Sequence, residues 1–145
     1  AAAAAVLERF PHLKLVIDHL GLPPIDVSAE HPDLPGLLAL ARYPNVAVKL
    51  STLPSRSRLG YPFPDVHPLV MRVVAAFGAE RCFFGTDHTQ QRARGRATYR
   101  QEVDLFRQAL PFANERERQL VLGEAAAAYL GWPAGVPSTA LATAA

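Results

Sequence analysis

Three short apolar runs, each predicted to form a buried strand, alternate with helical segments along this chain. The strands are expected at Leu13–Ile17, Val46–Leu50 and Arg81–Gly85. Short apolar runs bounded by turn residues are typical of strands that are buried in a parallel sheet. Each run is followed by a loop and then by apolar residues at helical spacing. The pattern therefore predicts an α/β fold with parallel strands and right-handed crossovers.

The helical segments have recognisable ends. The clearest helix is 65–77, whose apolar residues fall on one face and which Gly78 ends. Further helices are expected at 1–10, 34–42 and 115–130. Thr98 is expected to cap another helix, in which a shared buried face is formed by Tyr99, Val103, Phe106 and Leu110.

Polar side chains stand where the predicted strands end, and this is where ligands gather in parallel α/β proteins. Because side chains alternate along a strand, the apolar positions of 46–50 face the helices and Lys49 faces the other side. The same alternation, counted along the other two strands, sends His19 and Asp87 to the side of Lys49. It sends Asp18 to the helix side, where a structural role is expected.

This convergence makes Asp87 and His19 the candidate catalytic residues. A carboxylate and an imidazole at neighbouring strand ends suit proton transfer or a hard metal ion. The non-catalytic alternatives are a helix-capping role for Asp87 and a packed core position for His19. Lys49 is a candidate substrate contact, or else an interior ion-pair partner of Asp87.

Arginines in the following loops indicate an acidic substrate. Arg56 and Arg58 follow the second strand, and the loop after the third strand carries Arg92, Arg94 and Arg96. Arginine binds carboxylates and phosphates through paired donors. Arg56 is the leading candidate for substrate binding, with Arg58 beside it, although loop arginines are often simply solvated.

Composition narrows the class of protein without naming an activity. The chain has 145 residues, half of them hydrophobic, with a net charge of +2 and a pI of about 9.0. This charge is too small to indicate nucleic-acid binding, and no apolar stretch has the length of a membrane span. The single cysteine, Cys82, permits no internal disulfide, so the cytoplasm is the default location. The chain opens without Met inside a helical pattern, which suggests the C-terminal piece of a longer protein.

Four stretches in order resemble the amidohydrolase superfamily, specifically the amidohydrolase-related branch called amidohydrolase 2. They are Phe10–Gly21, Tyr43–Ser51, Ala76–Asp87 and Leu122–Trp132. The resemblance implies the C-terminal part of a (β/α)8 TIM barrel, about three βα units, over residues 1–133. Residues 134–145 are then a flexible tail.

The resemblance also implies an activity, closest to the lactonase-like members. Such an enzyme opens a lactone, or cleaves an amide, of a small acidic substrate with a water activated by Asp87, while His19 polarises the carbonyl or passes a proton. A divalent metal, zinc or manganese, is implied in the full-length protein, or none. Its ligands would include Asp87 and His19, conditional on upstream ligands, because the family's opening His-x-His pair is absent here.

Other functions on the same scaffold stay open. A decarboxylase or hydratase would use the same strand ends, and a non-catalytic α/β binding module is a further alternative. The isolated fragment is expected to be inactive, since strands outside this chain would complete the site. No nucleic-acid or membrane partner is expected, and a homo-oligomer is left open.

Overall fold

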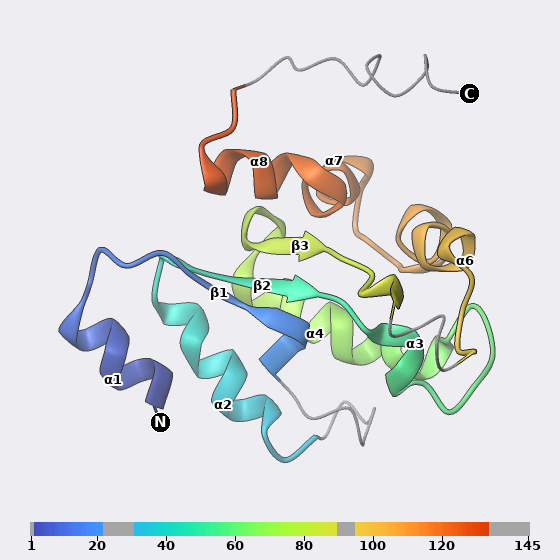
Figure 1. The fold of residues 1–145 in the computed structure, drawn as a ribbon, viewed down its shortest axis with the longest axis horizontal. Coiled ribbons are helices and arrows are strands. Elements are labelled where there is room, and N and C mark those ends of the chain that lie inside the picture. Colours follow the sequence, from blue (N-terminus) through green and yellow to red (C-terminus); the bar gives the residue numbers. More distant parts are fainter. Residues whose placement is uncertain (1, 22–30, 90–94, 134–145) are drawn as a thin grey trace.

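A parallel sheet lies at the centre of the fold, as the sequence predicts (Figure 1). The structure is a computed structural model that describes residues 2–21, 31–89 and 95–133. Its strands pair in the order β1 (Leu15–Ile17), β2 (Val46–Leu50) and β3 (Cys82–Phe84). Both pairings are parallel, with Leu15 opposite Val46 and Val48 opposite Cys82.

Helices cover the sheet from two sides. Figure 1 shows α2 (Leu34–Leu38) and α4 (His67–Phe77) on one side, and α7 (Glu115–Gln119) and α8 (Ala125–Leu130) on the other. The remaining helices are α1 (Ala2–Arg9), α3 (Leu53–Arg56) and α6 (Tyr99–Asp104). Short 3-10 turns flank α2 and α4, and π turns at Leu105–Ala109 and Leu120–Glu124 extend α6 and α7. No helix in the described ranges is long and apolar enough to cross a membrane.

The two faces of β2 pack against different partners. The outer face joins the main hydrophobic core, together with the buried side of α4, as the helical spacing predicts. The inner face contributes Ala47, which packs with Phe83 of β3 and Ala125 of α8 in a smaller cluster. Lys49 and Ser51 continue this inner face toward the end of the strand. The expected assignment of the faces of β2 is therefore confirmed.

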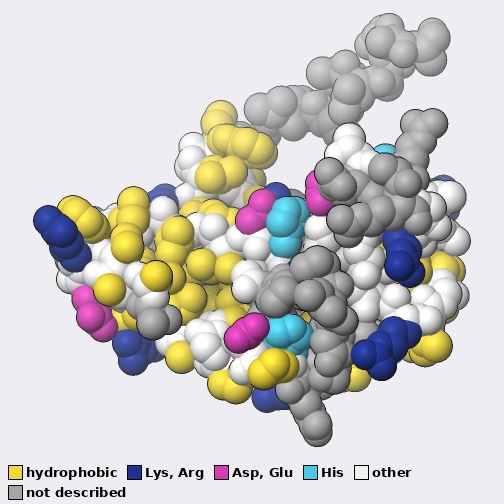
Figure 2. Space-filling view, turned by 60° about the horizontal axis from the view of Figure 1, so that its bottom comes forward, with side chains coloured by type: hydrophobic (Ala, Val, Ile, Leu, Met, Phe, Trp, Pro, Cys, Tyr) yellow, Lys and Arg dark blue, Asp and Glu magenta, His cyan; other side chains and the backbone are white. Residues whose placement is uncertain are grey.

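The first strand differs from its prediction, because it is shorter and is not buried. Val16 is 38% exposed, and its neighbours Leu15 and Ile17 are half-buried. Among the described residues β1 has one neighbouring strand, so it forms an edge of the sheet. Figure 2 shows hydrophobic side chains gathered toward the end of the molecule that carries α1, where Phe10 and Leu13 are also exposed.

The helix at 99–104 begins as expected, and its predicted apolar face is buried at Phe106 and Leu110 but not at Tyr99. Thr98 forms a capping box with Gln101, which confirms the predicted cap. Tyr99, expected in the core, is 57% exposed, whereas Glu102 is 2% exposed. Glu102 turns inward, as Phe106 and Leu110 do, and contacts His88. Arg92, Arg94 and the expected tail 134–145 lie outside the described residues.

Candidate active site

All three strands leave the sheet through a non-glycine residue in the left-handed backbone region. These residues are His19 after β1 (φ 51°), Thr52 after β2 (φ 60°) and Asp87 after β3 (φ 55°). A side chain in this region costs about 1–3 kcal/mol, so the surrounding contacts must hold it there. Such backbone strain gathers at functional sites. Here it marks the strand ends that carry both candidate catalytic residues.

The exit of β1 corrects the expected placement of Asp18. The register sets Leu15 opposite Val46, which places Leu15 and Ile17 on the helix side. Asp18 therefore lies on the inner face, where its Oδ1 is 2.6 Å from Lys49 Nζ. A regular strand would then point His19 outward. The left-handed turn at His19 instead carries its ring back to the inner face. His19 therefore lies on the predicted face, but because of this turn and not because of strand alternation.

Four side chains form a continuous polar chain across the ends of β1 and β2. Beyond the Lys49–Asp18 pair, Asp18 Oδ2 lies 3.3 Å from His19 Nε2, and His19 Nδ1 lies 2.7 Å from Ser51 Oγ. Burial acts to raise the pKa of Asp18, but the hydrogen bond and the charge of Lys49 outweigh it, so the pKa is lowered. Asp18 is thus an anion that orients His19 as well as pairing with Lys49.

The order Asp18, His19, Ser51 has the composition of a nucleophilic triad, but the environment argues against that chemistry. Ser51 is 0% exposed, so a substrate carbonyl has no access to its hydroxyl. The imidazole is about two-fifths exposed, with 38% of its side-chain surface accessible. Ser51 therefore acts as a support that fixes the ring of His19, and His19 is the group that a substrate can reach.

Arg56 does not occupy the mouth of the site, where the sequence placed it. It is 3% exposed, and its Nη2 donates a 2.6 Å hydrogen bond to the carbonyl oxygen of His19. Burial lowers the pKa of this guanidinium from its usual value. The reason for the difference is α3, which follows β2 directly and turns Arg56 back under the exit of β1. Substrate binding by Arg56 stays an untested prediction, and the observed contact is with the backbone of His19.

Lys49 and Arg58 are the other two candidate substrate-binding residues, and the structure shows what each one contacts. Lys49 pairs with Asp18, while its stem packs so closely on Gly85 that an added Cβ there would lie 3.0 Å from Lys49 Cδ. Arg58 is exposed, and its backbone N–H donates to Asp65 Oδ2 at 2.7 Å. Lys49 and Arg58 stay candidate substrate contacts.

The end of β3 brings a further pair beside Asp87. Asp87 is half-buried, and the next residue, His88, has its Nδ1 2.8 Å from Glu102 Oε1. Burial raises the pKa of Glu102; the hydrogen bond and charge of His88 oppose this rise, and the charge of Asp87 adds to it. No local pattern predicts this pair, because its members are 14 residues apart and Glu102 had no expected partner.

The described residues do not fit a metal ion by themselves. No group of three His, Cys, Asp or Glu side chains gathers within 2–21, 31–89 and 95–133. Both ring nitrogens of His19 also face partners, Asp18 and Ser51, rather than an open coordination position. Zinc needs three or four protein ligands, so Asp87 and His19 would have to be supplemented and rearranged to hold one.

Comparison with known proteins places this geometry in a family. The amidohydrolase family model matches residues 1–132. An L-fucono-1,5-lactonase of Burkholderia ambifaria is 37% identical over 97 residues, which cover 65% of this chain and 32% of that protein.

Two solved structures share the fold. An amidohydrolase of Burkholderia multivorans with bound zinc has a TM-score of 0.73 at 26% identity, over 89% of this chain and 48% of that one. A candidate 2-pyrone-4,6-dicarboxylic acid hydrolase of Pseudomonas putida has a TM-score of 0.71 at 25% identity, over 90% of this chain and 47% of that one. The chain thus spans between a third and a half of the relatives that it matches. It belongs to the amidohydrolase family, and its three-stranded sheet is part of a TIM barrel.

Proposed function

We propose that the protein hydrolyses a lactone of a small acidic substrate, with Asp87 as general base and His19 as the group that polarises the carbonyl. The observation that carries this proposal is the shared geometry of the strand exits. Both residues stand at left-handed turns where β1 and β3, the strands on either side of β2, end, and His19 is held between Asp18 and Ser51. Similarity to an L-fucono-1,5-lactonase supports the lactone.

The two residues have different roles in the proposed reaction. The Asp87 carboxylate takes a proton from water, and the water oxygen attacks the carbonyl carbon of the lactone. Negative charge then develops on the carbonyl oxygen, and His19 stabilises it when its Nε2 hydrogen turns from Asp18 Oδ2, 3.3 Å away, to that oxygen. The ring C–O bond breaks, and protonated Asp87 returns the proton it took from water to the leaving alkoxide, which yields the open hydroxy acid and restores the Asp87 carboxylate. No step here passes through a metal, in keeping with the donor set of the described residues.

Two features support an acidic substrate. Lys49 lies on the inner face with 37% of its side chain exposed, and Arg58 stands exposed after β2. The similar Pseudomonas putida structure is that of a candidate hydrolase for a dicarboxylic acid. A substrate with carboxylate groups would suit the cationic side chains of Lys49 and Arg58. The small acidic substrate remains part of the proposal.

Hydrolysis assays of the full-length gene product test this function. L-fucono-1,5-lactone and 2-pyrone-4,6-dicarboxylate are supplied, acid release is followed by pH-stat, and the products are identified by NMR. The proposal expects ring opening of at least one lactone without loss of carbon dioxide. Release of carbon dioxide, or turnover of neither lactone, contradicts it. Dialysis against a chelator before the assay separates a metal-dependent from a metal-independent enzyme.

A further inference from the structure

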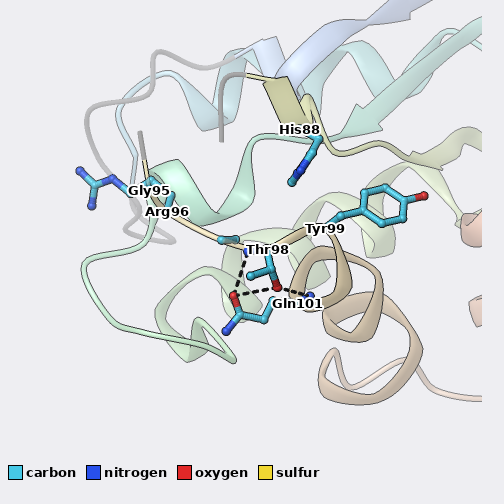
Figure 3. Close-up of a pocket in the computed structure, with 7 residues that line it drawn as sticks. His88, Gly95, Arg96, Thr98, Tyr99 and Gln101 are labelled. Atoms are coloured by element: carbon cyan, nitrogen blue, oxygen red, sulfur yellow. Dashed lines mark hydrogen bonds between the residues drawn. The ribbon is translucent and has the colours of Figure 1, made fainter. Parts of the chain in front are cut away.

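A pocket opens beside the exit of β3, at His88, the residue that follows Asp87 in the sequence. It has a volume of about 620 Å³, and its lining comprises His88, Gly95, Arg96, Ala97, Thr98, Tyr99 and Gln101. Figure 3 shows the ring of His88 pointing toward the backbone around Thr98, with the guanidinium of Arg96 directed away from it. The side chains of Thr98 and Gln101 are engaged with each other in the cap of α6. His88 is therefore the polar side chain best placed to meet a ligand.

A buried carboxylate fixes the orientation of His88. Glu102 is 2% exposed and accepts a 2.8 Å hydrogen bond from His88 Nδ1. The backbone N–H of His88 donates to Thr86 Oγ1 at 3.2 Å, and its ring meets that of Tyr99 edge-on at 5.5 Å between centroids. An imidazole held from one nitrogen in this way presents the other nitrogen in a set direction, as the outer partners of catalytic and metal-binding histidines do.

The hydrogen bond to Glu102 determines what the outer nitrogen can bind. A carboxylate accepts hydrogen bonds, so Nδ1 carries the hydrogen. Nε2 makes no hydrogen bond with any residue in the described part of the chain, and it accepts when the ring is neutral and donates when the ring is charged. A hydroxyl group pairs with Nε2 in either state, because it both donates and accepts. A carboxylate would pair only with the charged ring.

Tyr99 adds an aromatic surface to the same pocket. Its side chain is 57% exposed although the sequence pattern placed it in the core. The face of an aromatic ring carries partial negative charge and attracts the polarised C–H groups of a partner. A ligand that offers hydroxyl groups on one side and C–H groups on another matches both His88 and Tyr99. Polyhydroxylated rings and chains, as in sugar acids and their lactones, have this character.

We propose that this pocket binds the hydroxyl-bearing part of the substrate, with His88 Nε2 hydrogen-bonded to a substrate hydroxyl and Glu102 holding His88 in place. The inference rests on the proposed function, since it names the substrate class for the reaction assigned to Asp87. It assigns substrate binding to His88, and it makes Glu102 a positioning residue. The substrate is then a polyhydroxylated acid or lactone rather than a purely apolar one.

Binding measurements test the pocket without requiring hydrolysis. The full-length gene product is titrated by calorimetry with L-galactonate and D-gluconate, and with hexanoate, which has the same carboxylate and no hydroxyl groups. The wild type is expected to bind at least one of the two hydroxy acids about tenfold or more tightly than hexanoate. His88→Asn keeps a donor toward Glu102 but removes the outer nitrogen, so it is expected to weaken binding of that acid about tenfold and leave hexanoate unchanged.

A matched variant and an independent one complete the design. His88→Gln keeps a polar group at the outer position and is expected to retain affinity within about threefold. Tyr99→Ala alters an exposed side chain and keeps the proposal testable if the His88 variants do not fold; it is expected to weaken binding of the hydroxy acid several-fold. Equal affinity of the wild type for hydroxy acids and hexanoate, or an equal loss of affinity for both in His88→Asn, overturns the proposed role of the pocket. Because these outcomes do not depend on turnover, they are distinct from a failure of the lactonase assay.

Discussion

The first two strands of the sheet have similar apolar sequences but very different surroundings. β2 lies between two strands, is largely buried, and follows the alternation of faces read from its sequence. Among the described residues β1 pairs on one side, and it exposes Val16. Both strands end in left-handed residues, which are His19 and Leu20 after β1 and Thr52 after β2. The comparison shows that the sequence reveals which face is which where one face is apolar and fully buried, as in β2, whereas in the half-buried β1 the pairing with β2 decides it. The direction of His19 beyond β1 is set by contacts from elsewhere in the chain.

Those contacts come from the segment that follows β2. Ser51 holds the ring of His19 and Arg56 holds its carbonyl oxygen, so the second βα unit determines where the catalytic candidate of the first one points. β2 and the segment that follows it thus hold the site in place, and β1 carries the candidate catalytic residue His19. The following predictions test this division, beginning with the largest effect.

Matched valine truncations compare the two strands directly. Val48→Ala is expected to lower the free energy of unfolding of the 145-residue chain by about 2–3 kcal/mol, because Val48 is fully buried and a cavity remains. Val16→Ala, at a residue 38% exposed, is expected to cost less than about 1 kcal/mol. Urea denaturation of both variants provides the measurement, and equal losses would show that the two strands do not differ in this way.

Gly85→Ala tests the close packing between β3 and the inner face of β2. The new Cβ would lie 3.0 Å from Lys49 Cδ and 3.3 Å from Ser51 Cβ, so the polar chain that orients His19 would shift. We expect a loss of about 1–3 kcal/mol in stability, with reduced turnover in the full-length protein. Gly36→Ala is the control, since no atom lies within 4 Å of its added Cβ. It is expected to stabilise α2 by about 0.5–1 kcal/mol.

Removing the hydroxyl of Ser51 separates support of His19 from nucleophilic catalysis. Ser51→Ala is expected to cost about 1 kcal/mol in stability and to reduce kcat about tenfold or less, because Asp18 and Arg56 still hold His19. A nucleophilic serine would instead lose nearly all activity on substitution. Single-turnover kinetics with the lactone would decide between these outcomes, and complete inactivation would refute the supporting role.

The Asp18–Lys49 pair makes a small, pH-dependent contribution. The pKa of Asp18 is lower in the folded chain than in the unfolded one, so folding favours its ionised form. The stabilisation is therefore present above the ordinary carboxyl pKa and disappears as the pH falls through the lowered value. Wild type and Asp18→Asn are expected to differ by less than about 1 kcal/mol at pH 7. Their melting temperatures should converge as the pH falls through the lowered pKa of Asp18, and a difference that grows on acidification would contradict this sign.

Much of the frame was predictable from the sequence, and the details of the site were not. Hydrophobic spacing predicted β2, the buried face of the helix before Gly78 and the parallel order, because these depend on local pattern and burial. The prediction for Asp18 was wrong because the two faces of β1 were assigned the wrong way round: pairing with β2 puts Leu15 and Ile17 on the helix side and Asp18 on the inner face. The burial of Arg56, the exposure of Tyr99 and the His88–Glu102 pair depend on contacts between distant segments, which no local pattern contains.

The most direct test of the account is the turnover of a lactone by the full-length protein when Asp87 is replaced by Asn. Asp33→Asn, at a carboxylate whose side chain is 63% exposed, serves as the matched control. General-base catalysis predicts that Asp87→Asn lowers kcat by about 100-fold or more while the fold and the Asp33→Asn rate stay at wild-type values. Wild-type turnover in Asp87→Asn would contradict the central claim that the strand ends described here perform the chemistry.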